Sequence, residues 1–122
     1  MTLEMGKRIA EGREEVKLCA RIFEYYAHRG EEFLRPQTLP SPLGDGTLLN
    51  EPLGVLFGIQ PWNYPCYQVV RFAALLKHST TVQQCAEAID LLFRDANFPM
   101  GAYTNLVITA GLANKVIDDG RV

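Results

Sequence analysis

The stretch from Glu51 to Ala74, EPLGVLFGIQPWNYPCYQVVRFAA, limits the folds open to this chain most strongly. An apolar run over Val55–Ile59 is rich in strand formers, and the PWNYP turn then interrupts it because proline cannot donate a ladder hydrogen bond. The apolar residues after the turn suit a buried helix. A strand, an abrupt turn and a helix form the first half of a βαβ unit, which binds its ligand at the strand's carboxyl end, near the helix N-terminus. Trp62 and Asn63 occupy that place.

Four segments carry a family resemblance, and they follow a fixed order along nearly the whole chain. They are TLEMGK at Thr2–Lys7, EPLGVLFGIQPWNYP from Glu51, LLKHS at Leu75–Ser79 and FPMGAYTNLV at Phe98–Val107. Together they resemble the aldehyde dehydrogenases, and the KHS and FPMGAYTN wording is most similar to the succinate-semialdehyde dehydrogenase branch. The resemblance implies oxidation of an aldehyde, succinate semialdehyde in that branch, with NADP or NAD as cofactor.

The order of apolar patterns predicts an α/β fold, with an N-terminal helix followed by part of a Rossmann-like parallel sheet. Helical spacing predicts a helix over Met1–Leu34, with Gly30 near its end, and Arg35–Gly46 is rich in Pro and Gly and is predicted to be a linker. We therefore expect two units. Residues 1–46 form the helix and linker, and residues 47–122 form a partial nucleotide-binding domain.

Within the second unit we expect strands and helices in alternation. A strand at Thr47–Asn50 corresponds, in the family, to an extension that packs against a neighbouring subunit, and without its usual partner it would be an edge that invites association. Thr80 or Thr81 is a suitable N-cap for the helix that follows. The further elements expected are strands over 55–60, 75–77 and 103–108 and helices over 66–74, about 82–95 and 112–118.

The junction between Ala74 and Leu75 departs from the family pattern. Relatives have a proline-containing helix end, a glycine turn and half a strand between residues like these, whereas here the two segments abut. A helix needs connecting residues before a parallel neighbouring strand, because the chain must reverse direction. Either the protein carries an internal deletion here, or a loop is missing from the sequence.

Composition excludes several other classes of function. The chain has 122 residues, enough for a modest core, and a net charge of −2 gives no reason to expect a nucleic acid or an anionic membrane as partner. Its apolar runs are too short to span a bilayer, and no basic region precedes them at Met1, so we expect a cytoplasmic protein. A small aldehyde is the expected partner, and the family's tendency to form dimers and tetramers raises the expectation of a homo-oligomer.

Asn63 is the main candidate for chemistry. Taken alone, an Asn in a Pro-rich turn more often caps the backbone with its side chain. The resemblance instead implies that its amide donates a hydrogen bond to the substrate oxygen during nucleophilic attack. A neutral amide suits an oxyanion stabiliser because it offsets developing negative charge without giving up a proton.

Pro61, Trp62 and Lys77 are the candidates for cofactor contact. The resemblance implies that backbone at Pro61 and Trp62 lies along the cofactor, whereas a lone Trp is otherwise most often a core residue. Lys77 is predicted to end a strand, from where its ammonium can reach a ribose or phosphate. The matching family lysine binds the adenosine ribose hydroxyls. Gly58 also matches a family glycine, although close packing would explain it equally well.

Ser79 and Thr80 bear on the choice between NAD and NADP. Thr80 falls where NAD-preferring members carry a glutamate that holds the 2′-hydroxyl, and a carboxylate there would repel a 2′-phosphate. A small hydroxyl does not, so with Ser79 adjacent we expect NADP to be tolerated or preferred.

The three cysteines, Cys19, Cys66 and Cys85, are too few and too widely spaced to predict a disulfide framework or a metal site. Each lies among apolar residues and is predicted to be a small buried hydrophobe. Cys66 begins a helix, where a thiolate is favoured, but the family's nucleophile lies far downstream. Because the catalytic cysteine and the glutamate base both lie beyond this sequence, we expect no dehydrogenase activity from these residues alone. The alternative is a catalytically inactive, truncated relative that binds nucleotide weakly or pairs with another subunit.

Overall fold

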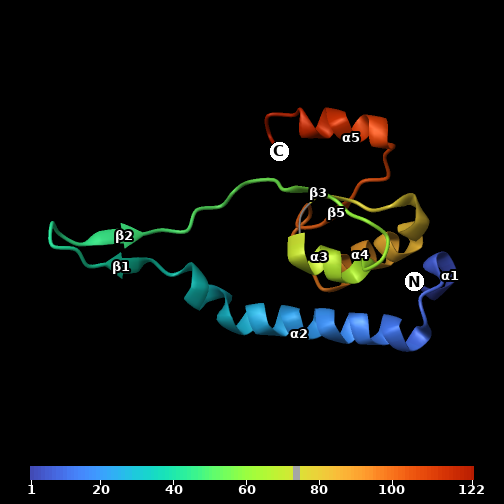
Figure 1. Cartoon of the computed structure of the whole chain (residues 1–122), viewed down its shortest axis with the longest axis horizontal. Helices are drawn as coiled ribbons and strands as arrows, with labels where there is room; N and C mark the ends of the chain where they lie inside the picture. Colours follow the sequence, from blue (N-terminus) through green and yellow to red (C-terminus); the bar gives the residue numbers. More distant parts are fainter. Residues whose placement is uncertain (73–74) are drawn as a thin grey trace.

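The computed structural model describes residues 1–72 and 75–122, and these residues form a small α/β body with a projecting arm (Figure 1). A long N-terminal helix runs beneath the body, and a two-stranded hairpin extends away from it. The predicted combination of an N-terminal helix with a parallel sheet is confirmed.

The N-terminal segment forms two helices instead of the single predicted one. They are α1 (Thr2–Met5) and α2 (Ile9–Leu34). Gly6 ends α1 with a left-handed backbone, φ 71°, which glycine adopts at little cost. α2 ends at Leu34, as predicted, and Gly30 lies within its last turns rather than ending it.

The predicted linker contains a strand. β1 (Gln37–Leu39) pairs antiparallel with β2 (Gly46–Leu48), and Thr38 lies opposite Thr47. The strand expected at Thr47–Asn50 is therefore shorter, begins one residue earlier and has a partner. All six strand residues are exposed, so this hairpin adds nothing to the core.

The three-stranded sheet is parallel and has the order β3-β4-β5. β3 (Phe57–Ile59) pairs with β4 (Leu75–Lys77), and Gly58 lies opposite Leu76. β5 (Thr104–Asn105) pairs with the other side of β4. The strand predicted over 103–108 thus forms only at its start.

Helices follow the strands as expected. α3 (Pro65–Phe72) begins at the second proline of the turn, a position where the missing N–H costs nothing. A short 3₁₀ turn, η1 (Thr80–Val82), leads into α4 (Gln83–Asp95), and α5 (Ala110–Ile117) follows β5. The Thr109 side chain caps α5 by accepting from the Leu112 N–H. In Figure 1, α3 and α4 lie on one side of the sheet and α5 on the other.

The core lies between the sheet and helices α3 and α4. It consists of Val69, Leu76, Ile89 and Tyr103, with Cys66 and Phe93 packed against it. Because side chains alternate along a strand, the fully buried Leu76 faces the helices while its neighbours Leu75 and Lys77 face the other way.

The apolar residues that recur at helical spacing along α2 do not all face the body. Val16, Phe23 and Tyr26 are substantially exposed, and of these apolar residues only Cys19 is buried. The other buried residues of α2 are Gly12 and Glu15, a combination that apolar periodicity does not detect. Leu92 of α4 is exposed as well.

The Ala74–Leu75 junction, for which we predicted a deletion or an unseen loop, lies partly outside the described residues. The helices that the structure does describe include none long and apolar enough to cross a membrane.

Candidate functional site

The carboxyl ends of β3 and β4 form one edge, and the candidate residues gather there. The Gln60 N–H, just past β3, donates to the Lys77 carbonyl at the end of β4, with a donor–acceptor distance of 3.1 Å. The turn Pro61–Asn63 and the strand end at Lys77 are therefore neighbours, as parallel pairing requires.

The Asn63 side chain is exposed and is oriented by a buried neighbour. Gln68 of α3 donates from Nε2 to the Asn63 Oδ1 at 3.5 Å, while the Gln68 Oε1 is buried without a partner. This contact occupies the Asn63 oxygen and leaves its Nδ2 group as a donor. The bond that the structure shows thus runs to a side chain rather than to the turn backbone.

Trp62 and Pro61 lie at the surface. Trp62 is 50% exposed, so the core interpretation of this lone Trp is wrong. Both residues are available for contact with a ligand laid across the strand ends.

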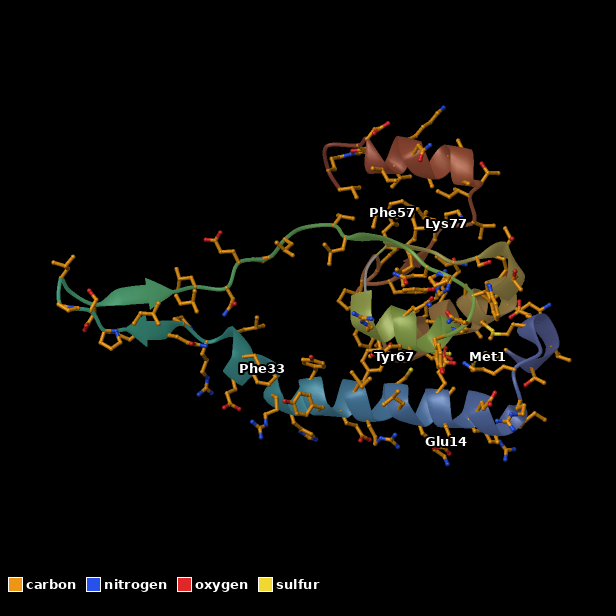
Figure 2. The ribbon with its side chains drawn as sticks, in the orientation of Figure 1. Met1, Glu14, Phe33, Phe57, Tyr67 and Lys77 are labelled. Carbon is orange, nitrogen blue, oxygen red and sulfur yellow. The ribbon has the colours of Figure 1, made fainter. Side chains whose placement is uncertain are left out.

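Lys77 is partly buried on the sheet face opposite the core, and Figure 2 shows it close to Phe57 on the side toward α5. Its Nζ donates to the His78 carbonyl at 3.5 Å. That long bond to its own neighbour leaves further donors of the ammonium group for a ligand.

Ser79 and Thr80 differ in their surroundings. The Ser79 Oγ accepts from the Thr81 N–H at 3.4 Å and so caps the 3₁₀ turn η1. The N-cap of α4 is Val82, which makes no side-chain capping bond, so the prediction that Thr80 or Thr81 caps this helix was wrong. Thr80 is exposed. Of these two residues, Ser79 uses its hydroxyl for capping and Thr80 does not.

The N-terminus of α3 does not offer the ligand site that a βαβ unit predicts. The carboxylate of Glu15, from α2, accepts from the N–H groups of Cys66 at 2.9 Å and Tyr67 at 3.2 Å. It also forms an ion pair with Lys7. Since these N–H groups are taken, an anionic ligand cannot use them. Sequence reasoning missed Glu15 because it sits within a run of charges expected to face solvent.

A second carboxylate closes the N-terminus of α4. Glu4 of α1 accepts from the N–H groups of Gln84 at 2.7 Å and Cys85 at 3.0 Å. Partial burial acts to raise the pKa of Glu4, but hydrogen bonds from the Cys85 thiol and these N–H groups outweigh it and lower the pKa. The TLEMGK segment thus supplies two functional groups, Glu4 and Lys7, whose roles its sequence alone did not predict.

The cysteines do not behave as nucleophiles here. Burial raises the pKa of Cys66 to about 12 and that of Cys19 to about 11, with the Glu15 carboxylate adding to both. Cys66 therefore stays a thiol at neutral pH although it begins a helix. Only Cys19 is fully buried, so the prediction of three buried cysteines holds for one of them.

His78, directly after Lys77, is fully buried, and its Nε2 lies 3.2 Å from the Tyr103 hydroxyl. Burial lowers the pKa of His78, which keeps the ring neutral. The contact joins the end of β4 to the start of β5 and fixes the strand end that carries Lys77.

Known proteins similar to this chain include two curated enzymes. Succinate-semialdehyde dehydrogenase [NADP(+)] of Deinococcus radiodurans is 51% identical over 126 residues, which cover 96% of this chain and 26% of that enzyme. The probable succinate-semialdehyde dehydrogenase [NADP(+)] of Synechocystis sp. is 40% identical over 131 residues, which cover 100% of this chain and 29% of that protein. The chain thus spans little more than a quarter of the length of these relatives.

A solved structure shares the fold. Succinic semialdehyde dehydrogenase from Streptococcus pyogenes, in complex with NADP+, superposes with a TM-score of 0.94 at 35% identity, over 99% of this chain and 29% of that one. The aldehyde dehydrogenase family model matches residues 1–122. On this evidence the chain belongs to the aldehyde dehydrogenase family.

Proposed function

We propose that this chain supplies part of the cofactor-binding domain of an enzyme that oxidises an aldehyde, succinate semialdehyde, to the carboxylate with NADP. The observation that carries the proposal is the shared edge of β3 and β4, which brings the Asn63 turn beside Lys77. Relatives named as NADP-dependent succinate-semialdehyde dehydrogenases support the choice of substrate and cofactor.

Each candidate residue has a distinct task in this proposal. The Lys77 ammonium would bind the adenosine ribose, and Pro61 and Trp62 would lie along the cofactor. The Nδ2 group of Asn63, whose oxygen accepts from Gln68, would donate to the substrate oxygen and stabilise the negative charge that develops on it. The cofactor, when bound, accepts the hydride; the nucleophilic cysteine and the base would come from residues beyond these 122.

The preference for NADP rests on local charge. The loop from Lys77 to Val82 contains no carboxylate, and Thr80 offers a free hydroxyl. Because Glu4 occupies the α4 N–H groups, a 2′-phosphate would rely on Lys77, Thr80 and Ser79 rather than on the helix end. Titration calorimetry with the 122-residue chain should show tighter binding of NADP than of NAD. Equal affinities, or tighter NAD, would contradict the preference.

The alternative function is that of an inactive relative acting as a weak nucleotide-binding or subunit-interaction module. The Synechocystis alignment spans 131 positions for the 122 residues here, so that relative has at least nine residues (131 minus 122) without a counterpart. The alternative would follow if these residues are deleted from the protein itself rather than missing from the sequence. The exposed hairpin β1–β2 would be the surface for such pairing. Association with a full-length relative, measured by sedimentation and lost when the hairpin is shortened, would favour this alternative.

A further inference from the structure

A buried ion pair lies where the segment between α1 and α2 meets the turn after β3. The side chains of Lys7 and Glu15 are 8% and 1% exposed, respectively, and they contact each other directly. The other ion pairs within α2, such as Lys17 with Glu14, are well exposed. Burying two charges costs them their hydration, and this cost often cancels the attraction between them, so that a buried pair contributes little net stability. The other contacts of the pair therefore indicate its role.

Those contacts fall on the turn that carries Asn63 and on the start of α3. The Lys7 Nζ donates to the Asn63 carbonyl at 2.9 Å and lies 3.9 Å from the centre of the Tyr64 ring. Glu15 accepts from the Cys66 and Tyr67 N–H groups at the start of α3. The pair therefore contacts both sides of Pro65 from a segment about fifty residues earlier in the sequence.

We propose that Lys7 and Glu15 are positioning residues that fix the backbone of the Asn63 turn, so that the Asn63 amide is aimed before a ligand arrives. The proposal rests on the proposed role of Asn63. Rotation about the Asn63 backbone would swing its side chain, and an oxyanion donor must be held to within about 0.5 Å of its productive place. Lys7 holds the carbonyl of that residue, while Glu15 holds the helix that begins two residues later.

Gln68 completes the arrangement from within α3. Its contact with the Asn63 Oδ1 sets the side-chain amide, but this works only if the turn and α3 keep a fixed spacing. The Glu15 carboxylate anchors the first turn of α3, and Lys7 anchors the residue that Gln68 orients. The ion pair thus keeps the Asn63 backbone and the first turn of α3 at the spacing that the contact between Gln68 and the Asn63 side chain requires.

The test uses NMR of the ¹⁵N-labelled 122-residue chain, which is 13.7 kDa. Two signals report directly: the side-chain amide of Asn63, and hydrogen exchange of the Cys66 and Tyr67 backbone amides. In Lys7→Gln and Glu15→Gln we expect exchange at both amides to rise at least about tenfold and the Asn63 side-chain amide to become mobile. Lys7→Arg should keep the parent signals, because it retains a charged donor.

Glu14→Gln and Lys17→Gln are the matched controls, because they remove an exposed pair from the same helix, and Figure 2 shows Glu14 pointing away from the body. If Lys7→Gln and Glu15→Gln change the reporter signals no more than these controls do, the proposal is wrong. If Glu15→Gln unfolds the chain, the comparison of Lys7→Gln with Lys7→Arg decides: equal Asn63 signals in the two would overturn it.

The readout does not require NADP. A rigid turn that depends on Lys7, in a chain that fails to bind NADP, would contradict the proposed function and leave the positioning role standing. If the chain binds NADP but its Asn63 signals are the same in the parent and in Lys7→Gln, only the positioning role is contradicted.

Discussion

At the scale of single residues, Gly58 shows how closely β3 and β4 approach. A Cβ added at Gly58 would overlap the Cδ2 of Leu76, a fully buried side chain. We expect Gly58→Ala to lower the free energy of unfolding by about 1–3 kcal/mol through overpacking. Urea denaturation followed by circular dichroism measures this loss.

Gly111→Ala is the control for that substitution, because a Cβ at Gly111 meets no atom within 4 Å and the residue lies inside α5. It should be neutral or slightly stabilising, since alanine favours helix. A Gly58→Ala protein as stable as the parent would contradict the assigned packing.

The thiols give the chain a pH dependence above neutrality. The pKa of Cys66 is raised by burial from 9.0 to about 12, so between these values the unfolded thiol is ionised while the folded one keeps its proton. The unfolded state then binds fewer protons, and stability must fall as pH rises through this window. The stability that the protonated Cys66 thiol contributes is fully present below about pH 9.

Urea midpoints measured from about pH 8 to about pH 11 should therefore decline, and Cys66→Ala should decline less steeply than the parent. The Cys85→Ala protein is a useful comparison, since Cys85 contacts the Glu4 carboxylate rather than the core cluster. Parallel pH curves for the parent and Cys66→Ala would show that the Cys66 thiol is not the cause.

Individual residues also show what the sequence could and could not predict about the site. The closeness of Asn63 and Lys77 could be predicted, because the turn after one strand and the end of its parallel neighbour must lie at the same edge of the sheet. Glu15 and Glu4 could not, since each acts on a helix more than fifty residues away and both resemble ordinary solvent-facing charges. The run Arg13–Glu15 gives no sign of which glutamate is buried.

At the scale of elements, the helices and strands were predicted where local patterns determine them. The α3 boundary follows from Pro65, and the strands β3 and β4 follow from their apolar runs. The hairpin could not be predicted, because β1 lies among prolines and its pairing with β2 is exposed on both faces. β5 is limited to Thr104–Asn105, and its last backbone bond to β4 runs from the Leu106 N–H to the Leu76 carbonyl. Local propensity does not contain this limit, because it depends on pairing with a distant strand.

At the scale of the whole molecule, the proposed cofactor edge at β3 and β4 has no cysteine thiolate at neutral pH among the described residues. Cys66 and Cys19 are thiols at neutral pH, and Cys85 has a raised pKa through burial and its bond to Glu4. We therefore expect no NADPH formation when the pure 122-residue chain is mixed with NADP and succinate semialdehyde. Measurable turnover by the pure chain would contradict this assignment of the chemistry to residues beyond these 122, and its loss in a triple Cys→Ala variant would place the nucleophile among its cysteines.

The central claim is that NADP binds across the ends of β3 and β4, and Trp62 provides the most direct test. It is the one Trp of the chain, is half exposed and precedes Asn63, so its fluorescence reports on this edge alone. Titration with NADP should change Trp62 emission with saturation. Lys77→Met should weaken that binding about tenfold, the effect of losing one charge-assisted hydrogen bond, whereas Lys115→Met in α5 should leave it unchanged. An unchanged emission at saturating NADP, or equal affinities for the two lysine variants, would contradict the account.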